Sequence, residues 1–132
     1  MDFDWLRTSC LSFRGSYEDY PFGPDIAVFR VRADRWAGSG VPGKIFALVP
    51  VDADPPSVSL KCDPALAQQL RAAHPEITGA WHLNKRHWNG VRLDGDLPAA
   101  TVRDLIEDSY DLVVASLPAD HRHALGWTGG TP

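Results

Sequence analysis

The densest set of chemically capable side chains in this chain lies in residues 81–93, WHLNKRHWNGVRL. Within this stretch there are two Trp, two His, two Asn and three cationic side chains. Lys and Arg neutralise phosphates, Asn hydrogen-bonds phosphate oxygens or base edges, and aromatic rings stack on bases or pack against sugars. This mixture is typical of a surface that contacts a polyanion.

The candidate nucleic-acid-binding residues come from this segment and from one neighbouring strand. Alternation along a strand at 88–93 would place Trp88, Gly90 and Arg92 on one face, and Lys61 could add charge beside them. The candidates are Lys61, His82, Asn84, Lys85, Arg86, His87, Trp88 and Arg92, with Asn89 as a further hydrogen-bonding group. A structural interpretation stays open, in which Trp81 and Trp88 are core aromatics and the charged residues line the solvated side.

Charge is distributed unevenly along the chain. The net charge is -4, which argues against a protein that is basic all over. Residues 61–92 carry five Lys/Arg against two Asp/Glu, whereas residues 93–132 carry two against seven. Such asymmetry is found where a polyanion-facing surface lies beside an acidic face, and it also arises by chance in a small chain.

The sequence patterns for a metal site, a nucleophile or a phosphate-binding loop are weaker. A metal site would have to combine His82 and His87 with Cys62 or with the pair His121 and His123, but the spacing of the first two fits neither a helix face nor a strand face. No known nucleophile signature surrounds either cysteine. The run from Gly38 to Lys44 has P-loop spacing but lacks the following Ser or Thr, and its segment is expected to be a strand. We therefore predict a non-enzymatic protein without metal or cofactor.

A ridge of carboxylates on the last long helix has two interpretations. Carboxylates spaced by three and four residues usually form the solvated face of a helix. Cation binding is the functional alternative. The ridge consists of Asp104, Glu107, Asp108 and Asp111.

The elements that position the candidates follow from apolar periodicity. Strands are predicted at 26–31, 44–51, 57–62 and 88–93. One helix is predicted at residues 2–13. A second begins at Asp63 and Pro64 and ends before Pro75. The third and longest lies within residues 96–118 and ends at Pro118. In the last helix the buried stripe is expected to hold Val102, Leu105, Ile106, Ser109, Leu112 and Val113. We expect residues 15–25 to form an ordered loop, with Tyr20, Pro21 and Phe22 packed beneath it. The 32–43 link is expected to project from the sheet. The tail after Pro118 is expected to fray.

These elements predict a single α+β domain over residues 1–132, with an antiparallel meander sheet and helices packed on one face. The length suffices for a hydrophobic core. Cys10 and Cys62 are expected to be reduced thiols in a cytoplasmic protein. No signal peptide or membrane span is expected.

The chain resembles the MmcQ/YjbR family of small bacterial proteins in five segments that follow the family's order. They are CLSFRGSYEDYPFGPDIAVFRV, FALV, VSLKCDPALAQQLR, WHLNKRHWNGVRLDG and LIEDSYDLVVASLP. The resemblance implies a fold similar to frataxin-like and secretion-chaperone-like folds, and DNA binding through a double-wing surface. The wings would correspond to residues 32–44 and 82–92. The link RADRWAGSGVPG is longer than in the family, so it would either extend the first wing or be a neutral insertion.

The leading hypothesis is therefore a DNA-binding protein that uses the candidates named above. The main alternative is a protein-interaction or chaperone-like adaptor that docks through Trp36, Trp81, Trp88 and Trp127. A third hypothesis places a small-molecule pocket near Tyr17, Tyr20 and Phe22. DNA or a protein partner is expected, without a membrane, and the sequence leaves the oligomeric state open.

Overall fold

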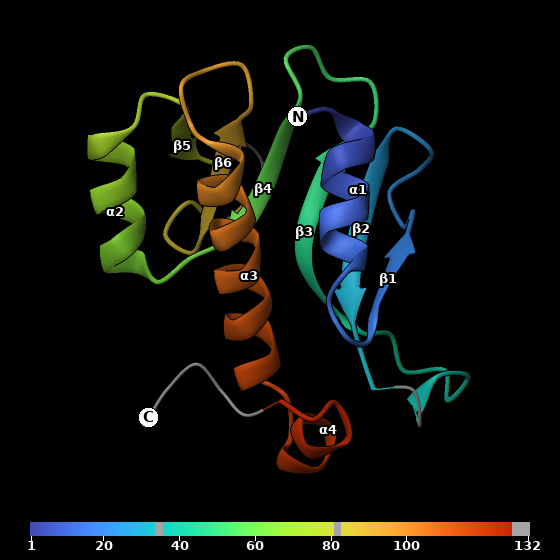
Figure 1. The fold of residues 1–132 in the computed structure, drawn as a ribbon. Coiled ribbons are helices and arrows are strands. Elements are labelled where there is room, and N and C mark those ends of the chain that lie inside the picture. Colours follow the sequence, from blue (N-terminus) through green and yellow to red (C-terminus); the bar gives the residue numbers. More distant parts are fainter. Residues whose placement is uncertain (34–35, 81–82, 128–132) are drawn as a thin grey trace.

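The computed structural model describes residues 1–33, 36–80 and 83–127, and it is an α+β fold with one antiparallel sheet (Figure 1). The strands are β1 (Ser16–Asp19), β2 (Ile26–Val31), β3 (Lys44–Pro50), β4 (Ser57–Lys61), β5 (Ile77–Gly79) and β6 (Trp88–Arg92). The helices are α1 (Phe3–Leu11), α2 (Pro64–Ala73), α3 (Ala99–Ala115) and α4 (Ala119–Ala124). The four predicted strands and the three predicted helices are all present.

The sheet has the strand order β1-β2-β3-β4-β6-β5, and every pair in it is antiparallel. The first four strands form a meander, of which β2, β3 and β4 were predicted and β1 was not. After β4 the chain crosses through α2 to the edge strand β5, and β6 then returns between β5 and β4. The consequence is that β4 and β6, which carry the candidate residues, are direct neighbours.

The helices cover one face of the sheet, as predicted, and no helix of the described residues lies on the other face (Figure 1). Residues of α1 and α3 share a core with the inward residues of the sheet. Leu6, Phe29, Phe46, Val102 and Ile106 are each fully buried in that core. Burial of this apolar surface contributes most of the favourable free energy of folding.

Helix α2 begins as the sequence predicts. The Asp63 carboxylate accepts a hydrogen bond from the backbone N–H of Leu66 at 3.3 Å, and Pro64 is the first helical residue. Proline is suited to this position because the N–H it lacks would have no partner within the helix. The helix ends at Ala73, just before His74 and Pro75.

The buried stripe of α3 differs from the predicted stripe in its C-terminal residues. Val102, Ile106, Ser109 and Val113 are buried as expected, but Tyr110 and Val114 complete the stripe, and Leu112 is exposed. With Tyr110 and Val114 included, the buried stripe is centred near Ile106, and position 112 lies about a third of a turn from that centre.

Ser109 joins α3 to two strands that have separated. β3 and β4 pair only at Ala47–Leu60 and Leu48–Ser59. Beyond that point the fully buried Ser109 hydroxyl donates to the carbonyl of Phe46 at 2.6 Å and accepts from the backbone N–H of Lys61 at 2.8 Å. The Ser109 hydroxyl of α3 thereby replaces the backbone pairing that β3 and β4 lack at this point.

Three local expectations were wrong. The segment 15–25 contains the edge strand β1, whose mixed polar sequence SYED gives no clear alternation. Tyr20 is 41% exposed and Phe22 is 63% exposed, so they are not packed beneath a loop. The segment after Pro118 forms α4, and Leu125 at its end is buried in the core. Within the described residues, no helix is long and apolar enough to cross a membrane.

Candidate nucleic-acid interface

The turn that leads into β6 is built around Asn84. Its carbonyl accepts from the backbone N–H groups of His87 and Trp88 at 3.0 and 2.9 Å. Its side-chain oxygen accepts from the N–H of Arg86 at 3.0 Å. Asn often closes turns in this way because its side chain reaches its own backbone two residues on. The Asn84 amide oxygen therefore stabilises the turn, so the main role of this side chain is structural.

Arg71 of α2 braces the same turn from the helix side. Its Nε donates to the side-chain oxygen of Asn89 at 2.7 Å. Its Nη2 donates to the carbonyls of Lys85 and Trp88. From the other side, the backbone N–H of Cys62 donates to the carbonyl of His87 at 2.8 Å. The backbone of residues 84–88 is thus fixed, while the side chains of Lys85 and Arg86 are exposed to solvent.

The register of β4 and β6 brings Lys61 opposite Trp88 and Ser57 opposite Arg92. Asn89 and Val91 point into the core, so Trp88, Gly90 and Arg92 occupy the open face, as the alternation predicted. Lys61 lies on the same face because Val58 and Leu60 are the buried residues of β4. Lys61, Trp88 and the 84–88 turn therefore meet at one end of the sheet.

Not every candidate is brought into this group. Arg92 lies at the other end of β6, about 13 Å away along the strand, where its Nε is 3.3 Å from the Asp94 carboxylate. Asn89 is only 3% exposed and is bound to Arg71, so it faces the core and does not reach a ligand. His87 is half-buried with its backbone engaged. His82 and Trp81 lie outside the described residues.

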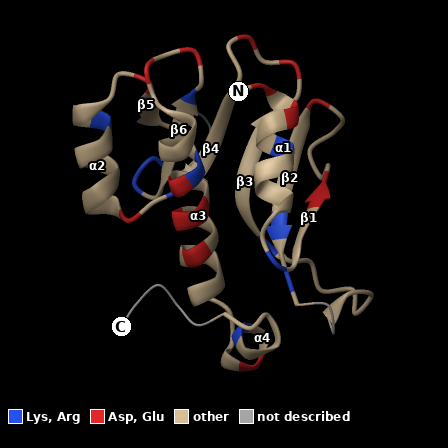
Figure 2. Ribbon diagram, viewed as in Figure 1, with Lys and Arg blue, Asp and Glu red and all other residues tan. Residues whose placement is uncertain are grey.

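Cations outnumber carboxylates at one end of the sheet, where Asp63 is also exposed, and carboxylates gather at the other (Figure 2). At the Arg92 end, the connections 20–25, 51–56 and 93–98 contain five Asp and no Lys or Arg; they are Asp25, Asp52, Asp54, Asp94 and Asp96. At the Lys61 end, the described cations are Arg14, Arg32, Lys44, Lys61, Lys85 and Arg86. A polyanion would be attracted to the Lys61 end and repelled from the other.

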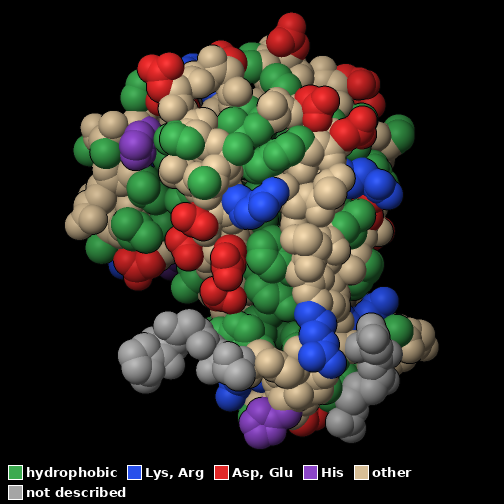
Figure 3. Space-filling view, viewed as in Figure 1, with side chains coloured by type: hydrophobic (Ala, Val, Ile, Leu, Met, Phe, Trp, Pro, Cys, Tyr) green, Lys and Arg blue, Asp and Glu red, His purple; other side chains and the backbone are tan. Residues whose placement is uncertain are grey.

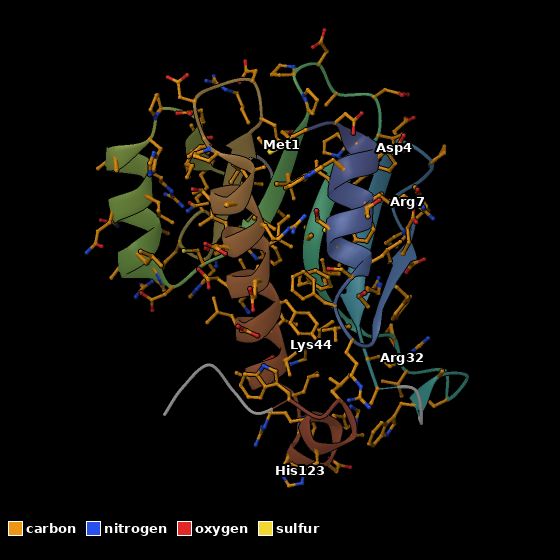
Figure 4. All side chains as sticks on the ribbon, in the orientation of Figure 1. Met1, Asp4, Arg7, Arg32, Lys44 and His123 are labelled. Carbon is orange, nitrogen blue, oxygen red and sulfur yellow. The ribbon has the colours of Figure 1, made fainter. Side chains whose placement is uncertain are left out.

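The 32–43 link and the 80–87 connection lie at this same basic end of the sheet. The link extends beyond the strands, as expected (Figure 1). It is held against α4 by Trp36, whose ring stacks on His121 with centroids 3.6 Å apart. Its cations are engaged: Arg32 donates to the Val41 carbonyl at 3.1 Å and Lys44 reaches the Ser116 hydroxyl at 3.2 Å. Figure 4 labels Arg32 and Lys44, which lie near each other beside α4. Arg35 lies outside the described residues.

The helical face is acidic. Red side chains gather over α3 in Figure 3, where Asp104, Glu107 and Asp108 are exposed. A hollow of about 340 Å³ between α2 and α3 is lined by Asp63, Asp108 and Asp111. Burial raises the pKa of the Asp108 carboxyl, and the charges of Asp111 and Asp104 raise it further. Phosphates would be repelled from this face, so an interface with a polyanion belongs to the opposite side or to the basic end.

The two thiols are unpaired and buried. Burial raises the pKa of Cys10 to about 12 and raises that of Cys62 as well. A thiol in this state carries almost no nucleophilic thiolate at neutral pH. Among the described residues, no group of three or more His, Cys, Asp or Glu side chains is placed to hold a metal ion.

A groove of about 620 Å³ on the open face of the sheet was not predicted from the sequence. Its walls include Leu48, Pro50 and Leu83, and Phe22 lies at its rim. The signal that could have revealed it is the set of small outward residues, Ser57 and Ser59 in β4 and Gly90 in β6. Of the aromatics proposed for a small-molecule pocket, Phe22 lines this groove, whereas the Tyr17 hydroxyl accepts from the N–H of Gly43 elsewhere.

An antiparallel sheet with helices on one face, an open opposite face and a basic turn at one end defines a small α+β protein of the kind expected from the sequence. The chain belongs to the YjbR family, whose model matches residues 11–112. It is 42% identical over 81 residues to the uncharacterized protein YjbR of Escherichia coli K12, a match that covers 61% of this chain and 69% of the relative. It is 36% identical over 98 residues to the uncharacterized protein YbdF of Escherichia coli O157:H7, covering 74% and 72%.

Solved structures agree with this assignment. The crystal structure of the Deinococcus radiodurans protein DR2400, with a DUF419 domain, superposes with a TM-score of 0.83 at 34% identity, covering 99% of this chain and 96% of that one. A Pseudomonas syringae protein superposes with a TM-score of 0.69 at 31% identity, covering 86% and 99%. The α+β fold is therefore shared along nearly the whole chain.

Proposed function

We propose that this protein is a non-enzymatic DNA-binding protein whose interface is the basic end of the sheet. The observation that carries the proposal is that Lys61, partly exposed on the open face, lies at the same end of the sheet as the turn that carries the exposed Lys85 and Arg86. None of the ion pairs formed within the described residues involves Lys61 or Arg86. Their charges are therefore available to phosphates.

The rigidity of the turn supports this role. Phosphate contacts set the position of a protein on DNA, and they do so best from a fixed backbone. Asn84 and Arg71 hold the backbone of residues 84–88 before any ligand arrives. Trp88 lies opposite Lys61, so an aromatic ring and a cation are next to each other, as in surfaces that bind bases and phosphates together.

Affinity is expected to be modest and strongly dependent on salt. Three phosphate contacts would give a slope of about 2–3 in a plot of log affinity against log salt. The net charge of -4 lowers the affinity further, because the acidic helical face repels the rest of the polymer. A cytoplasmic location, which the sequence predicts, would place the protein together with DNA.

Fluorescence anisotropy with a labelled DNA duplex across a salt series tests the proposal. The double variant Lys85→Ala with Arg86→Ala should reduce the salt slope by about 1.5–2 and weaken binding at low salt. Arg103→Ala is the matched control, because it removes one exposed cation from the acidic helical face and should leave the slope unchanged. Wild-type binding that ignores salt, or a double variant that binds like wild type, would contradict the proposal.

The adaptor alternative has less support from the geometry. Trp36 is stacked on His121, and the Trp127 indole donates to Asp111 at 3.1 Å. Trp88 lies on the open face of the sheet, away from both. The described members of the Trp set therefore do not share one docking surface. A pull-down repeated after nuclease treatment separates the two functions, since an adaptor would keep its partners.

A further inference from the structure

The groove on the open face has a floor of small side chains in one row across the sheet. Leu48 of β3 is opposite Ser59 of β4, Ser59 is opposite Gly90 of β6, and Gly90 is opposite Thr78 of β5. Ser59 and Gly90 form the low middle of this row, between the larger Leu48 and Thr78. A Cβ added at Gly90 would have its nearest neighbour, Oγ1 of Thr78, at 3.7 Å, which is an ordinary van der Waals contact, so it would fit without a clash.

We propose that this groove receives a base of single-stranded nucleic acid, while the sugar–phosphate backbone passes over Lys61. The inference rests on the proposed function and narrows it, because a base can enter the groove only when it is not paired within a duplex. The groove lies beside the 84–88 turn, because Leu83, which precedes the turn, forms one of its walls.

The chemistry of the lining suits a base. A base has two flat apolar faces and a polar edge. The floor offers a flat surface over Gly90 and an apolar wall at Leu48, and the hydroxyls of Ser57, Ser59 and Thr78 can hydrogen-bond the polar edge. The volume of about 620 Å³ lies within the range of small-ligand sites. Phe22, which is 63% exposed at the rim, is an aromatic ring available for stacking by a neighbouring base.

Charge indicates the path of the backbone. Lys61 is two residues along β4 from Ser59, which corresponds to about 7 Å, so it can reach the phosphate of a base that lies over Ser59. The Asp-rich connections at the opposite end would repel phosphates. Arg92 lines the groove on that side, and its guanidinium is paired with the Asp94 carboxylate. Because that carboxylate offsets its charge, Arg92 is better suited to donate a hydrogen bond to the edge of the base than to bind a phosphate. The backbone therefore leaves the groove toward Lys61 and the 84–88 turn.

Two variants fill the groove without touching the cations. Gly90→Val adds a branched side chain where the structure has room, in a strand that favours β-branched residues. Ser59→Leu fills the same space from the neighbouring strand, so the test does not depend on one variant. Far-UV circular dichroism and thermal unfolding establish that each variant is folded.

The experiment compares a labelled single strand of 12 nucleotides with a duplex of the same sequence, using the full chain. Wild type should bind the single strand more tightly, and each filling variant should lose about tenfold of that affinity, in line with the loss of one stacked base. Duplex affinity should change less than about twofold, because phosphate contacts remain. Unchanged single-strand binding in both folded variants overturns the inference and leaves the proposed function standing. Absence of binding to either oligonucleotide in wild type overturns both.

A dye displacement experiment decides between a base and another apolar occupant. Anilinonaphthalene sulfonate should bind wild type, should bind Gly90→Val less, and should be displaced by the single strand. Dye that occupies the groove in wild type and stays bound at saturating single strand assigns the groove to an apolar molecule or peptide, and overturns the inference.

Discussion

Lys61 and Trp88 lie directly opposite each other on neighbouring antiparallel strands, although they are far apart in the sequence. Both are partly exposed on the face of the sheet that carries no helix. The pair is formed because the chain passes through α2 and β5 before β6 returns beside β4. A cation and an aromatic ring are thereby placed next to the exposed turn that carries Lys85 and Arg86.

Lys61 and Arg92 should differ in their effect on DNA binding, although both are cations on the same face. Lys61→Ala should reduce the salt slope for duplex DNA by about 0.7–0.9, the contribution of one phosphate contact. Arg92→Ala should change it little, because the Arg92 guanidinium is paired with Asp94 at the acidic end. Salt-series anisotropy on the two variants measures this difference, and equal slopes would contradict the assignment of the interface to the Lys61 end.

Arg71→Lys should loosen the basic turn while keeping the positive charge. A lysine ammonium cannot reproduce the planar donor set that joins Asn89, Lys85 and Trp88. The buried Asn89 oxygen would lose its donor, at a cost of about 1–3 kcal/mol in the free energy of unfolding. Hydrogen exchange should accelerate at the amides of His87 and Trp88, which bond to Asn84.

The control for this variant is Arg103→Lys, on the exposed side of α3, where the guanidinium lies 5.9 Å from the centre of the Trp5 ring. It should leave exchange in residues 84–88 unchanged. Protection in the turn that survives Arg71→Lys would show that Asn84 alone fixes the backbone.

Ser109→Ala should destabilise the fold strongly for so small a change. It leaves the N–H of Lys61 and the carbonyl of Phe46 without their buried partner, at a cost of about 2–4 kcal/mol in the free energy of unfolding. Thr8→Ala, which removes an exposed hydroxyl from α1, should change it by less than about 0.5 kcal/mol. Urea unfolding of both variants gives the comparison, and similar midpoints would mean that the separated strands do not depend on α3.

Glu76 should make the protein sensitive to acid. Its side chain is nearly buried, and its pKa is held below the ordinary value of 4.5 by hydrogen bonds from its own backbone N–H and from that of Asp96. A carboxyl whose pKa is lowered by folding contributes stability above its unfolded pKa and loses it as the pH falls through the folded value. The free energy of unfolding should therefore fall as the pH drops below about 4.5.

Glu76→Gln should reduce that pH dependence, since the amide cannot be protonated in this range. Chemical unfolding at pH 7 and at low pH measures the difference for each protein. Glu107→Gln, which removes one carboxylate from the exposed side of α3, controls for the loss of a charge. An identical pH dependence in wild type and Glu76→Gln would assign the acid sensitivity to other groups.

The sequence by itself determined the local elements and most of the side chains that face solvent. The Asp63–Pro64 start of α2, the alternation of β4 and β6, and the exposure of Lys85 and Arg86 all follow from patterns within a few residues of one another, and the structure agrees with each. Such patterns are local because capping and alternation act between near neighbours in the chain. β1 was missed because a short, polar edge strand lacks the periodicity that reports burial.

Only the tertiary structure decided which side chains meet. Lys61 faces Trp88 and Ser59 faces Gly90 because β6 lies between β4 and β5, an order that short-range patterns do not specify. The same arrangement turns Asn89 inward to Arg71 and leaves Arg92 beside Asp94, so two candidates leave the interface. The groove also depends on the tertiary structure, because its floor is a row across four strands and exists only once their register is set.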